Sequence, residues 1–409
     1  MFKNDRVTCV APWHNIRIDG LGVRYCDGTK EIKHTENILD WWQNGSHIVN
    51  VRKNIQQGVP VSGCNRCYDA DNKNQTSFRT RKNFQSAIYE GNYFHHSLMQ
   101  SPARPIMQKT HLNELPKNIT VAFSNLCNSR CRMCNEEVSH LIAIDQGSKN
   151  PLIQLNSHQI DQIHELIDKN DNLFYVEITG GEPFLQQEVL QFLNRMVSNQ
   201  QQHVRVNIHT NGTIWNQQLI DVLSNFSNLW LAISIETMHE SNNYIRLGSD
   251  IDQVRQIITN FRSLLPRAKE IYLHCTPQAL SVMYIDTLFD YCIKHKINLI
   301  GNPLYFPRHL DIDVVTPNLK KELAQMLKQK YKIDPPSMDI NADAVNNYEK
   351  YTSQDIPGSV IEVCRKTIQC LEHPEPHDIV ERRRLFHHAL KHWNLIDNKY
   401  FSRLLCTIT

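Results

Sequence analysis

Three cysteines lie in one short segment, Cys127-Asn-Ser-Arg-Cys131-Arg-Met-Cys134. The segment directly follows an apolar run, residues 119–123, which is typical of a β-strand. Functional loops of parallel α/β sheets lie beyond the carboxyl ends of strands, so this is the place for a catalytic loop. Structural zinc takes four ligands, usually as two separated pairs. Three cysteines without a close fourth favour an iron–sulfur cluster with one iron left open for a substrate or cofactor.

A glycine turn, Gly180-Gly181-Glu182-Pro183, follows the next predicted strand, residues 174–179. Its two glycines allow the backbone to approach a ligand closely. A turn of this kind is weak evidence when it stands alone. Here the cysteine triad and the glycine turn each follow one of two consecutive predicted strands. The two motifs therefore strengthen each other.

Together the two motifs resemble the radical S-adenosylmethionine (SAM) superfamily. In that family a Cys-x3-Cys-x2-Cys segment after the first strand holds a 4Fe–4S cluster, and the open iron chelates the amino acid end of SAM. The resemblance implies that Cys127, Cys131 and Cys134 hold this cluster. It also implies that Gly180, Gly181, Glu182 and Pro183 bind the SAM ammonium group. The implied activity is reductive cleavage of SAM to a 5′-deoxyadenosyl radical, which abstracts hydrogen from a substrate.

Three later segments also resemble the family. His209-Thr-Asn211-Gly closes the third strand, Ser234-Ile-Glu236 closes the fourth, and Tyr-Ile-Arg246-Leu-Gly resembles a following Arg-x-Gly element. The resemblance implies that Asn211, Ser234, Glu236 and Arg246 bind SAM, with Arg246 pairing to its carboxylate. Two positions depart from the family pattern: Met133 replaces an aromatic residue near the adenine, and Glu236 replaces an aspartate.

A second set of four cysteines stands near the amino terminus: Cys9, Cys26, Cys64 and Cys67. By count, four cysteines can hold zinc or an iron–sulfur cluster, and composition alone favours zinc. However, Cys9-Val-Ala-Pro-Trp, a Gly-x3-Cys segment ending at Cys26 and Cys64-Asn-Arg-Cys67-Tyr resemble the twitch or SPASM auxiliary-cluster modules of radical SAM enzymes. The resemblance implies an auxiliary 4Fe–4S cluster, with zinc as the alternative. In most such enzymes the module follows the barrel, whereas here it precedes it.

The elements that must position these residues indicate an α/β fold. Repeated strand–helix units imply a parallel sheet covered by helices, and six units suffice for a partial (β/α)6 barrel over residues 106–312. Strands are predicted at 119–123, 174–179, 204–209, 229–235, 271–275 and 297–300, and helices at 157–168, 187–197, 216–223, 252–265 and 284–295.

Two further regions flank the predicted barrel. A small cysteine-rich module, residues 1–105, precedes it and ends in a proline-marked connector, 101–105. A helical region, residues 313–409, follows. Its first helix is predicted to begin at Thr316-Pro317, with the threonine hydroxyl as the cap.

The composition excludes some functional classes. Lys+Arg 44 against Asp+Glu 42 gives a net charge of +2, so no global field marks a nucleic-acid binder, although a local basic groove stays open. No apolar stretch approaches the roughly 20 residues of a membrane span, and the amino terminus lacks the apolar run of a secretory signal. We therefore expect a soluble cytoplasmic protein that binds no membrane.

The partners follow from the resemblance. Similarity to twitch and SPASM enzymes implies a peptide or protein substrate, with a nucleobase or nucleoside as the alternative. A low-potential electron donor such as flavodoxin or ferredoxin is also implied. A hypothesis from another class is a zinc-binding adaptor without radical activity. The turn at Gly180 argues against it, because a scaffold has no need of that turn.

Overall fold

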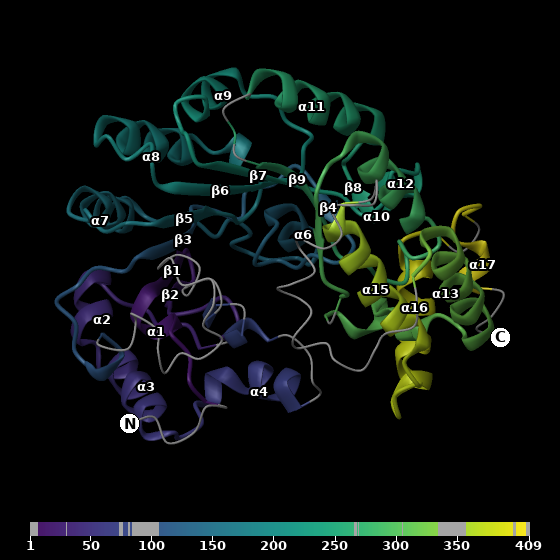
Figure 1. Cartoon of the computed structure of the whole chain (residues 1–409), viewed down its shortest axis with the longest axis horizontal. Helices are drawn as coiled ribbons and strands as arrows, with labels where there is room; N and C mark the ends of the chain where they lie inside the picture. Colours follow the sequence, from purple (N-terminus) through teal and green to yellow (C-terminus); the bar gives the residue numbers. More distant parts are fainter. Residues whose placement is uncertain are drawn as a thin grey trace. The chain divides into compact units, whose positions relative to one another are not determined.

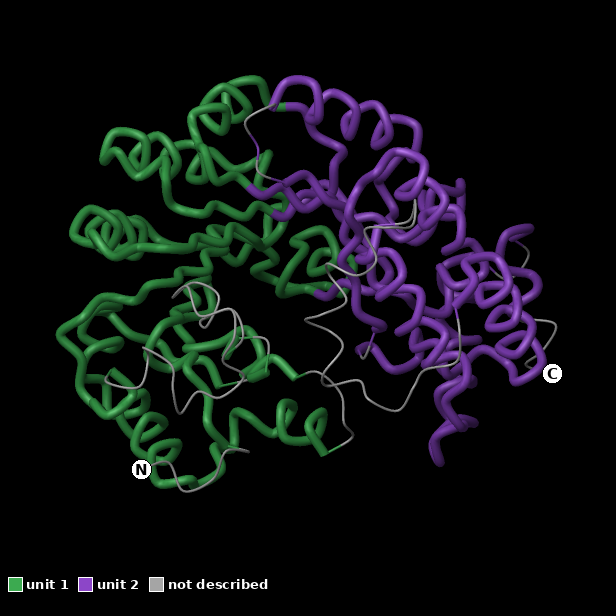
Figure 2. Tube along the Cα trace, in the orientation of Figure 1, with its two compact units in different colours: residues 1–126, 136–208, 216–229 green, residues 127–135, 209–215, 230–409 purple. Residues whose placement is uncertain are grey.

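A computed structural model describes residues 7–29, 31–72, 77–80, 82–83, 106–265, 268, 270–304, 306–333, 357–395 and 398–405. The chain divides into two compact units (Figure 2). Unit 1 comprises residues 1–126, 136–208 and 216–229, and unit 2 comprises residues 127–135, 209–215 and 230–409. The predicted connector at 101–105 lies outside the described residues, and the domain boundaries at 105 and 312 stay predictions.

The sheet of unit 1 has the strand order β2–β1–β3–β5–β6 (Figure 1). β1 (Asn15–Asp19) and β2 (Gly22–Arg24) form an antiparallel hairpin in which Asp19 stands opposite Gly22. β1 also pairs in parallel with β3 (Asn118–Ala122), β3 with β5 (Tyr175–Ile178), and β5 with β6 (Arg205–Thr210). The amino-terminal hairpin therefore continues the same sheet as the first strands of the predicted barrel.

Unit 2 contains a second group of parallel strands, β7 (Leu229–Ser234), β9 (Glu270–Cys275) and β10 (Leu299–Gly301). It also contains a short antiparallel ladder between β4 (Arg130–Cys131) and β8 (Arg246–Leu247). All six strands predicted for the alternating region are present, each within two residues of the expected bounds.

Five predicted helices lie between these strands within one residue of their expected bounds: α7 (Ser157–Asp168), α8 (Gln187–Ser198), α9 (Gln217–Leu223), α11 (Ile251–Leu264) and α12 (Ile285–His295). Polar side chains start three of them. Asn156 and Gln159 form a capping box at α7, Asn216 caps α9, and Asp250 caps α11. The alternation of parallel strands and helices confirms the α/β class and is consistent with a partial (β/α)6 barrel.

Four helices precede or follow the amino-terminal hairpin in the chain: α1 (Ala11–His14), α2 (Ile38–Asn44), α3 (Ser46–Gln57) and α4 (Asn65–Asn72). The fully buried Arg52 ties several segments together, since its guanidinium donates to the carbonyls of Pro12 at 2.9 Å, Trp42 at 2.7 Å and Thr110 at 3.0 Å. Burial lowers the pKa of Arg52 to about 9. Carbonyl dipoles therefore compensate this buried cation in place of a carboxylate.

The described residues of the carboxyl-terminal part are mostly helical, as predicted, with α13 (Pro317–Tyr331), α15 (Gly358–Glu372), α16 (Ile379–His392) and α17 (Ser402–Leu405). α13 begins at Pro317 as expected, but the predicted hydroxyl cap is wrong. The Thr316 hydroxyl is buried and has no hydrogen-bond partner among the described residues. Proline at the first position removes one of the N–H groups that need a partner, and the hydroxyl accepts from none of the others. The described helices include none with the length and apolar character required to span a bilayer.

Candidate active site

The cysteine triad follows β3 and lies in unit 2. Cys131 is buried, while Cys127 and Cys134 are partly exposed. The N–H of Cys134 bonds to the carbonyl of Cys131 at 3.0 Å and closes a tight turn, and the N–H of Arg132 bonds to the carbonyl of Ile245 at 2.9 Å. The loop is therefore fixed both internally and against the segment that precedes β8.

The β4–β8 ladder joins the triad to the Arg-x-Gly segment. Cys131 stands opposite Arg246, and Arg130 stands opposite Leu247. Gly248 has φ +101°, and a Cβ there would lie 2.7 Å from the carbonyl oxygen of Asn128. Only glycine allows this close approach to the loop between the first two cysteines.

Arg246 makes a buried ion pair with Glu236, with 3.0 Å between Nη1 and Oε1. The other oxygen, Oε2, accepts the N–H of Thr276 at 2.8 Å. Burial raises the pKa of Glu236 against the opposing effect of Arg246. Although burial by itself would lower the pKa of Arg246, the neighbouring Cys131 and Glu236 raise it. Both SAM-contact candidates therefore meet at the triad.

The ion pair leaves one donor of Arg246 unused. Its Nε is buried and has no hydrogen-bond acceptor among the described residues. A buried guanidinium N–H without an acceptor is costly, and a carboxylate is the ligand group that suits it best. The residue therefore fits the SAM carboxylate that the family resemblance assigns to it.

Two of the triad thiols are linked to each other. A side-chain hydrogen bond with Cys134 lowers the pKa of Cys131 to about 7 against the effect of burial. The same bond, followed by burial, raises the pKa of Cys134 well above its usual value. The two thiols thus share one proton readily, and metal ligation needs deprotonated sulfur.

Asn211, which directly follows β6, supports the loop that carries the cysteine triad. Its Nδ2 donates to Asn128 Oδ1 at 2.8 Å and to Ser129 Oγ at 3.2 Å, and its Oδ1 accepts the N–H of Thr213 at 2.9 Å. Asn128 and Ser129 lie between the first two triad cysteines, so Asn211 positions the loop. Ser234 ends β7 and Met133 lies inside the triad loop, each partly exposed.

The glycine turn lies in unit 1 and bonds to the residues that lead into the triad. The N–H of Gly181 donates to the carbonyl of Ser124 at 2.9 Å, and that of Glu182 to the carbonyl of Leu126 at 2.7 Å. A Cβ at Gly181 would lie 2.1 Å from the carbonyl oxygen of Leu126. Leu126 is covalently followed by Cys127. The turn is therefore anchored one residue from the first triad cysteine.

The other residues of this turn have a defined backbone, and Glu182 and Pro183 are buried. Gly180 has φ +117°, a conformation that favours glycine. The fully buried Glu182 accepts the N–H of Phe184 on its own Oε1 at 3.1 Å, and Pro183 opens the short helix η4 (Pro183–Leu185). The backbone is therefore close to its neighbours and pre-set, as a ligand cradle requires.

The amino-terminal cysteines gather in one interior region of unit 1. Cys9, Cys26 and Cys67 are buried and Cys64 is partly exposed. Burial raises the pKa of Cys9, and the nearby Cys26, Cys64 and Cys67 add to the rise. The hydroxyl of Tyr25 lies 3.4 Å from Cys64 Sγ, and the N–H of Gly28 donates to Cys26 Sγ at 3.3 Å. Polar groups thus already contact two of the four sulfurs.

No group of three or more His, Cys, Asp or Glu side chains in the described part of the chain is arranged to hold a metal ion as it stands. A tetrahedral zinc site needs Zn–S distances of about 2.3 Å, which places its sulfurs about 3.8 Å apart. A 4Fe–4S cluster binds each thiolate on a different iron, so its ligands stand farther apart.

Sequence reasoning gave no signal for the partners that organise the site, namely Asn128, Ser129 and the N–H of Thr276. Gln278 differs from these, because its position just after the strand predicted at 271–275 already makes it a candidate substrate contact, and it is fully buried. Neither Nε2 nor Oε1 of Gln278 has a hydrogen-bond partner in the described residues. An amide buried in this way is a candidate ligand contact.

The chain is similar to one protein family and to several solved structures. A model of the Radical SAM superfamily matches residues 121–276. No curated protein sequence matches the chain. Among solved structures, SuiB from Streptococcus suis bound to the precursor peptide SuiA is 15% identical, with a TM-score of 0.40 over 61% of this chain and 59% of that one. anSMEcpe with bound AdoMet and Cp18Cys peptide is 14% identical, with a TM-score of 0.38 over 52% of this chain and 59% of that one. The chain thus spans about three fifths of the length of each.

Proposed function

Because the chain contains a domain of the radical SAM superfamily, we propose that it reductively cleaves SAM and uses the resulting radical to modify a substrate. When bound, the 4Fe–4S cluster would pass one electron to the SAM sulfonium, giving methionine and a 5′-deoxyadenosyl radical that abstracts hydrogen. Cys127, Cys131 and Cys134 would hold the cluster. The observation that carries the proposal is the anchoring of Gly181 and Glu182 on Ser124 and Leu126, directly before the triad.

The surrounding residues would bind and orient SAM. The Nε donor of Arg246 would take its carboxylate, while Glu236 holds the guanidinium in place. The backbone of Gly180 and Gly181 would lie against the ammonium end. Met133, Asn211, Ser234 and Pro183 would complete the SAM site, Asn211 through the loop that it supports.

Anaerobic reconstitution tests this activity. Iron and sulfide are quantified, and the protein is then treated with dithionite and SAM. We expect 5′-deoxyadenosine from the wild type and from a Cys370→Ser control, and none from Cys127→Ala, Cys131→Ala or Cys134→Ala. Cys370 is a partly exposed cysteine on α15, outside both cysteine sets. A wild type that binds zinc without iron and yields no 5′-deoxyadenosine would instead identify a zinc adaptor.

We propose further that the amino-terminal set holds an auxiliary 4Fe–4S cluster, with zinc as the alternative. The sequence resemblance to twitch and SPASM modules and the shared burial of Cys9, Cys26, Cys64 and Cys67 support this. A Cys9→Ala/Cys64→Ala double variant should lose about half of the iron and keep the triad cluster. Unchanged iron content would remove the auxiliary cluster from the proposal.

A peptide or protein is the proposed substrate, with a nucleobase or nucleoside as the alternative. The support is the resemblance of the amino-terminal module to those of peptide-modifying enzymes, and the continuity of β1 with β3 in one sheet. A low-potential cytoplasmic donor such as flavodoxin or ferredoxin would supply the electron. Neighbouring genes offer a direct check, because a small precursor peptide encoded nearby would favour peptide modification.

A further inference from the structure

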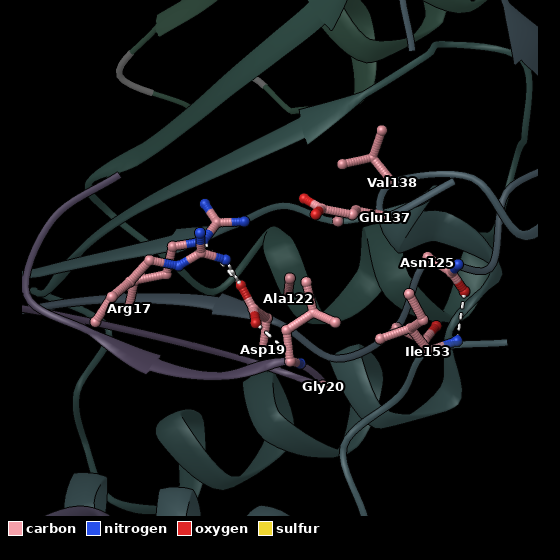
Figure 3. Close-up of a pocket in the computed structure, with 12 residues that line it drawn as sticks. Arg17, Asp19, Gly20, Ala122, Asn125, Glu137, Val138 and Ile153 are labelled. Atoms are coloured by element: carbon pink, nitrogen blue, oxygen red, sulfur yellow. Dashed lines mark hydrogen bonds and ion pairs between the residues drawn. The ribbon is translucent and has the colours of Figure 1, made fainter. Parts of the chain in front are cut away.

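A small pocket that is partly open to solvent lies within unit 1 beside the glycine turn (Figure 3). Three strand ends line it. Asp19 ends β1, Ala122 ends β3 directly opposite Asp19, and Gly180 follows β5. Because β1, β3 and β5 are parallel, these residues lie at one edge of the sheet, where ligands of open α/β sheets bind.

The hairpin β1–β2 supplies the charged wall of the pocket. Asp19 accepts from Arg17 Nε at 3.1 Å and from Arg24 Nη2, and its Oδ1 accepts the N–H of Leu21 at 3.1 Å. Arg17 and Arg24 stand opposite each other in the hairpin register. One carboxylate therefore holds two guanidinium groups in place and orders the turn at the same time.

This wall carries more positive than negative charge. Arg17 also bonds to Asp27 through Nη1 at 2.9 Å, and Lys82 Nζ lies 3.7 Å from the same carboxyl group. Of these side chains only Arg17, Arg24 and Asp19 line the pocket, so two guanidinium groups meet one carboxylate on this wall. Nε of Arg24 has no acceptor among the described residues, so the guanidinium pair is not saturated.

The opposite side of the pocket carries one exposed carboxylate, Glu137. In Figure 3 its side chain points toward the side from which Arg17 and Asp19 come. An anion built of oxygen atoms alone, such as phosphate, would place negative oxygens against Glu137 as well as against the guanidinium groups. A single carboxylate attached to an N–H donor matches both sides, the anion at the guanidinium groups and the donor at Glu137.

We propose that this pocket, beside the SAM turn, binds an acidic residue of the peptide substrate. The side-chain carboxylate lies against Arg17 and Arg24, and a main-chain N–H of the same residue donates to Glu137. Because Asp19 already orders the guanidinium pair, binding costs little side-chain entropy. The inference rests on the proposed peptide-modifying function and specifies which kind of residue stands beside the SAM site.

A titration of the full-length reconstituted protein tests the subsite. The probes are acetyl-glutamate methylamide, its neutral isostere acetyl-glutamine methylamide, and inorganic phosphate. Binding is followed by calorimetry and by the NMR signals of the arginine Nε–H groups, with the Arg24 signal identified from its absence in Arg24→Lys. We expect saturable binding of the acidic probe at low ionic strength and a shift of the Arg24 signal. The neutral isostere and phosphate should bind at least tenfold more weakly.

Variants separate this site from general charge effects. Arg24→Gln should weaken binding of the acidic probe at least fivefold. Arg24→Lys keeps the charge but lacks the paired N–H donors of a guanidinium group, and it should weaken binding less. Lys53→Gln, an exposed charge on α3, is the matched control and should bind as the wild type does. Thermal melting verifies that each variant is folded.

The outcomes distinguish this inference from the proposed function. Equal binding of the neutral isostere, tighter binding of phosphate, or no loss in Arg24→Gln would overturn the subsite. If the wild type forms 5′-deoxyadenosine but ignores the acidic probe, the subsite alone fails. If it binds the probe through Arg24 but yields no 5′-deoxyadenosine, the proposed function fails, and the pocket binds acidic residues without a role in SAM chemistry.

Discussion

Arg246 stands opposite Cys131 in the β4–β8 ladder. Its side chain pairs with Glu236 just beyond the carboxyl end of β7, and Glu236 in turn accepts the N–H of Thr276 just beyond β9. A short cysteine loop has no rigid core of its own, so its geometry depends on such ties to strands. Two successive strand ends are therefore connected to the central cysteine of the triad.

The ion pair should behave as a coupled unit. Arg246→Met leaves Glu236 buried without its partner and should cost about 3–5 kcal/mol of unfolding free energy. Arg246→Met combined with Glu236→Met should recover a large part of that loss, because no buried charge is left alone. Urea denaturation of the two variants and of Glu236→Met measures the coupling. Additive losses would show that the two side chains do not depend on each other.

The sequence was sufficient for the strands and helices of the alternating region because each is an amphipathic or apolar run with clear ends. α7, for example, carries its own capping box at Asn156 and Gln159. The sequence did not predict the β4–β8 ladder that holds the triad. β4 and β8 are two residues each and more than 100 positions apart in the chain, so no periodicity marks them. Such pairings depend on tertiary contacts.

The glycine turn at Gly180 was likewise predicted from the sequence only in part. The sequence indicated a close backbone approach, and Gly181 makes one, but to Leu126 of the chain itself. The parallel pairing of β1 with β3 also had no sequence signal, because β1 is short and lies about 100 residues before its neighbour. The pocket between hairpin and glycine turn follows from that pairing, and the sequence alone did not predict it.

Gly181→Ala should disrupt the anchoring of the triad. The added Cβ would lie 2.1 Å from a backbone oxygen, which cannot move aside as a flexible side chain would. We expect loss of most 5′-deoxyadenosine formation and a lower iron content per chain after reconstitution. Gly147→Ala is the control, since a Cβ there meets nothing within 4 Å although φ is +76°. If both variants retain wild-type iron and activity, the contact with Leu126 has no functional weight.

His14 should make the stability of the amino-terminal module depend on pH. Burial, assisted by Lys117, lowers the pKa of His14 from 6.5 to about 3. The unfolded chain therefore binds a proton between these values that the folded chain does not. The contribution of His14 to the unfolding free energy is fully present above pH 6.5. It falls as the pH drops toward 3, by up to about 1.4 kcal/mol per pH unit.

The difference between the wild type and His14→Gln isolates this effect from other titrating groups. Between pH 7 and pH 5 the unfolding free energy of the wild type should fall by about 2 kcal/mol because of His14. The variant should lack this part of the fall. Urea denaturation followed by tryptophan fluorescence at each pH is the measurement. Parallel pH profiles for the two proteins would contradict the assignment.

The triad loop should also depend on the carboxyl-terminal region of unit 2. The guanidinium of Arg132 lies 4.9 Å from the ring centroid of Trp393, and its Nε donates to the carbonyl of Tyr244 at 3.3 Å. Trp393→Leu keeps an apolar side chain but removes the cation–π contact, worth about 0.5–2 kcal/mol. We expect faster iron loss to a chelator, with the fold retained. Val380→Ala, an exposed position on α16, is the control and should release iron as the wild type does.

Gln278 allows a prediction in which stability and function change in opposite directions. Its side chain is fully buried and neither polar atom is bonded among the described residues, so Gln278→Leu removes an unsatisfied amide at similar volume. The free protein should gain about 1–3 kcal/mol of unfolding free energy. If the amide contacts SAM or substrate from the loop after β9, the same variant should bind SAM more weakly or couple SAM cleavage less well to substrate modification. Gln253→Leu, a control on α11 whose side chain already donates to Thr213, should not gain stability. A Gln278→Leu protein that is less stable than the wild type would show that the amide is satisfied by water within the fold.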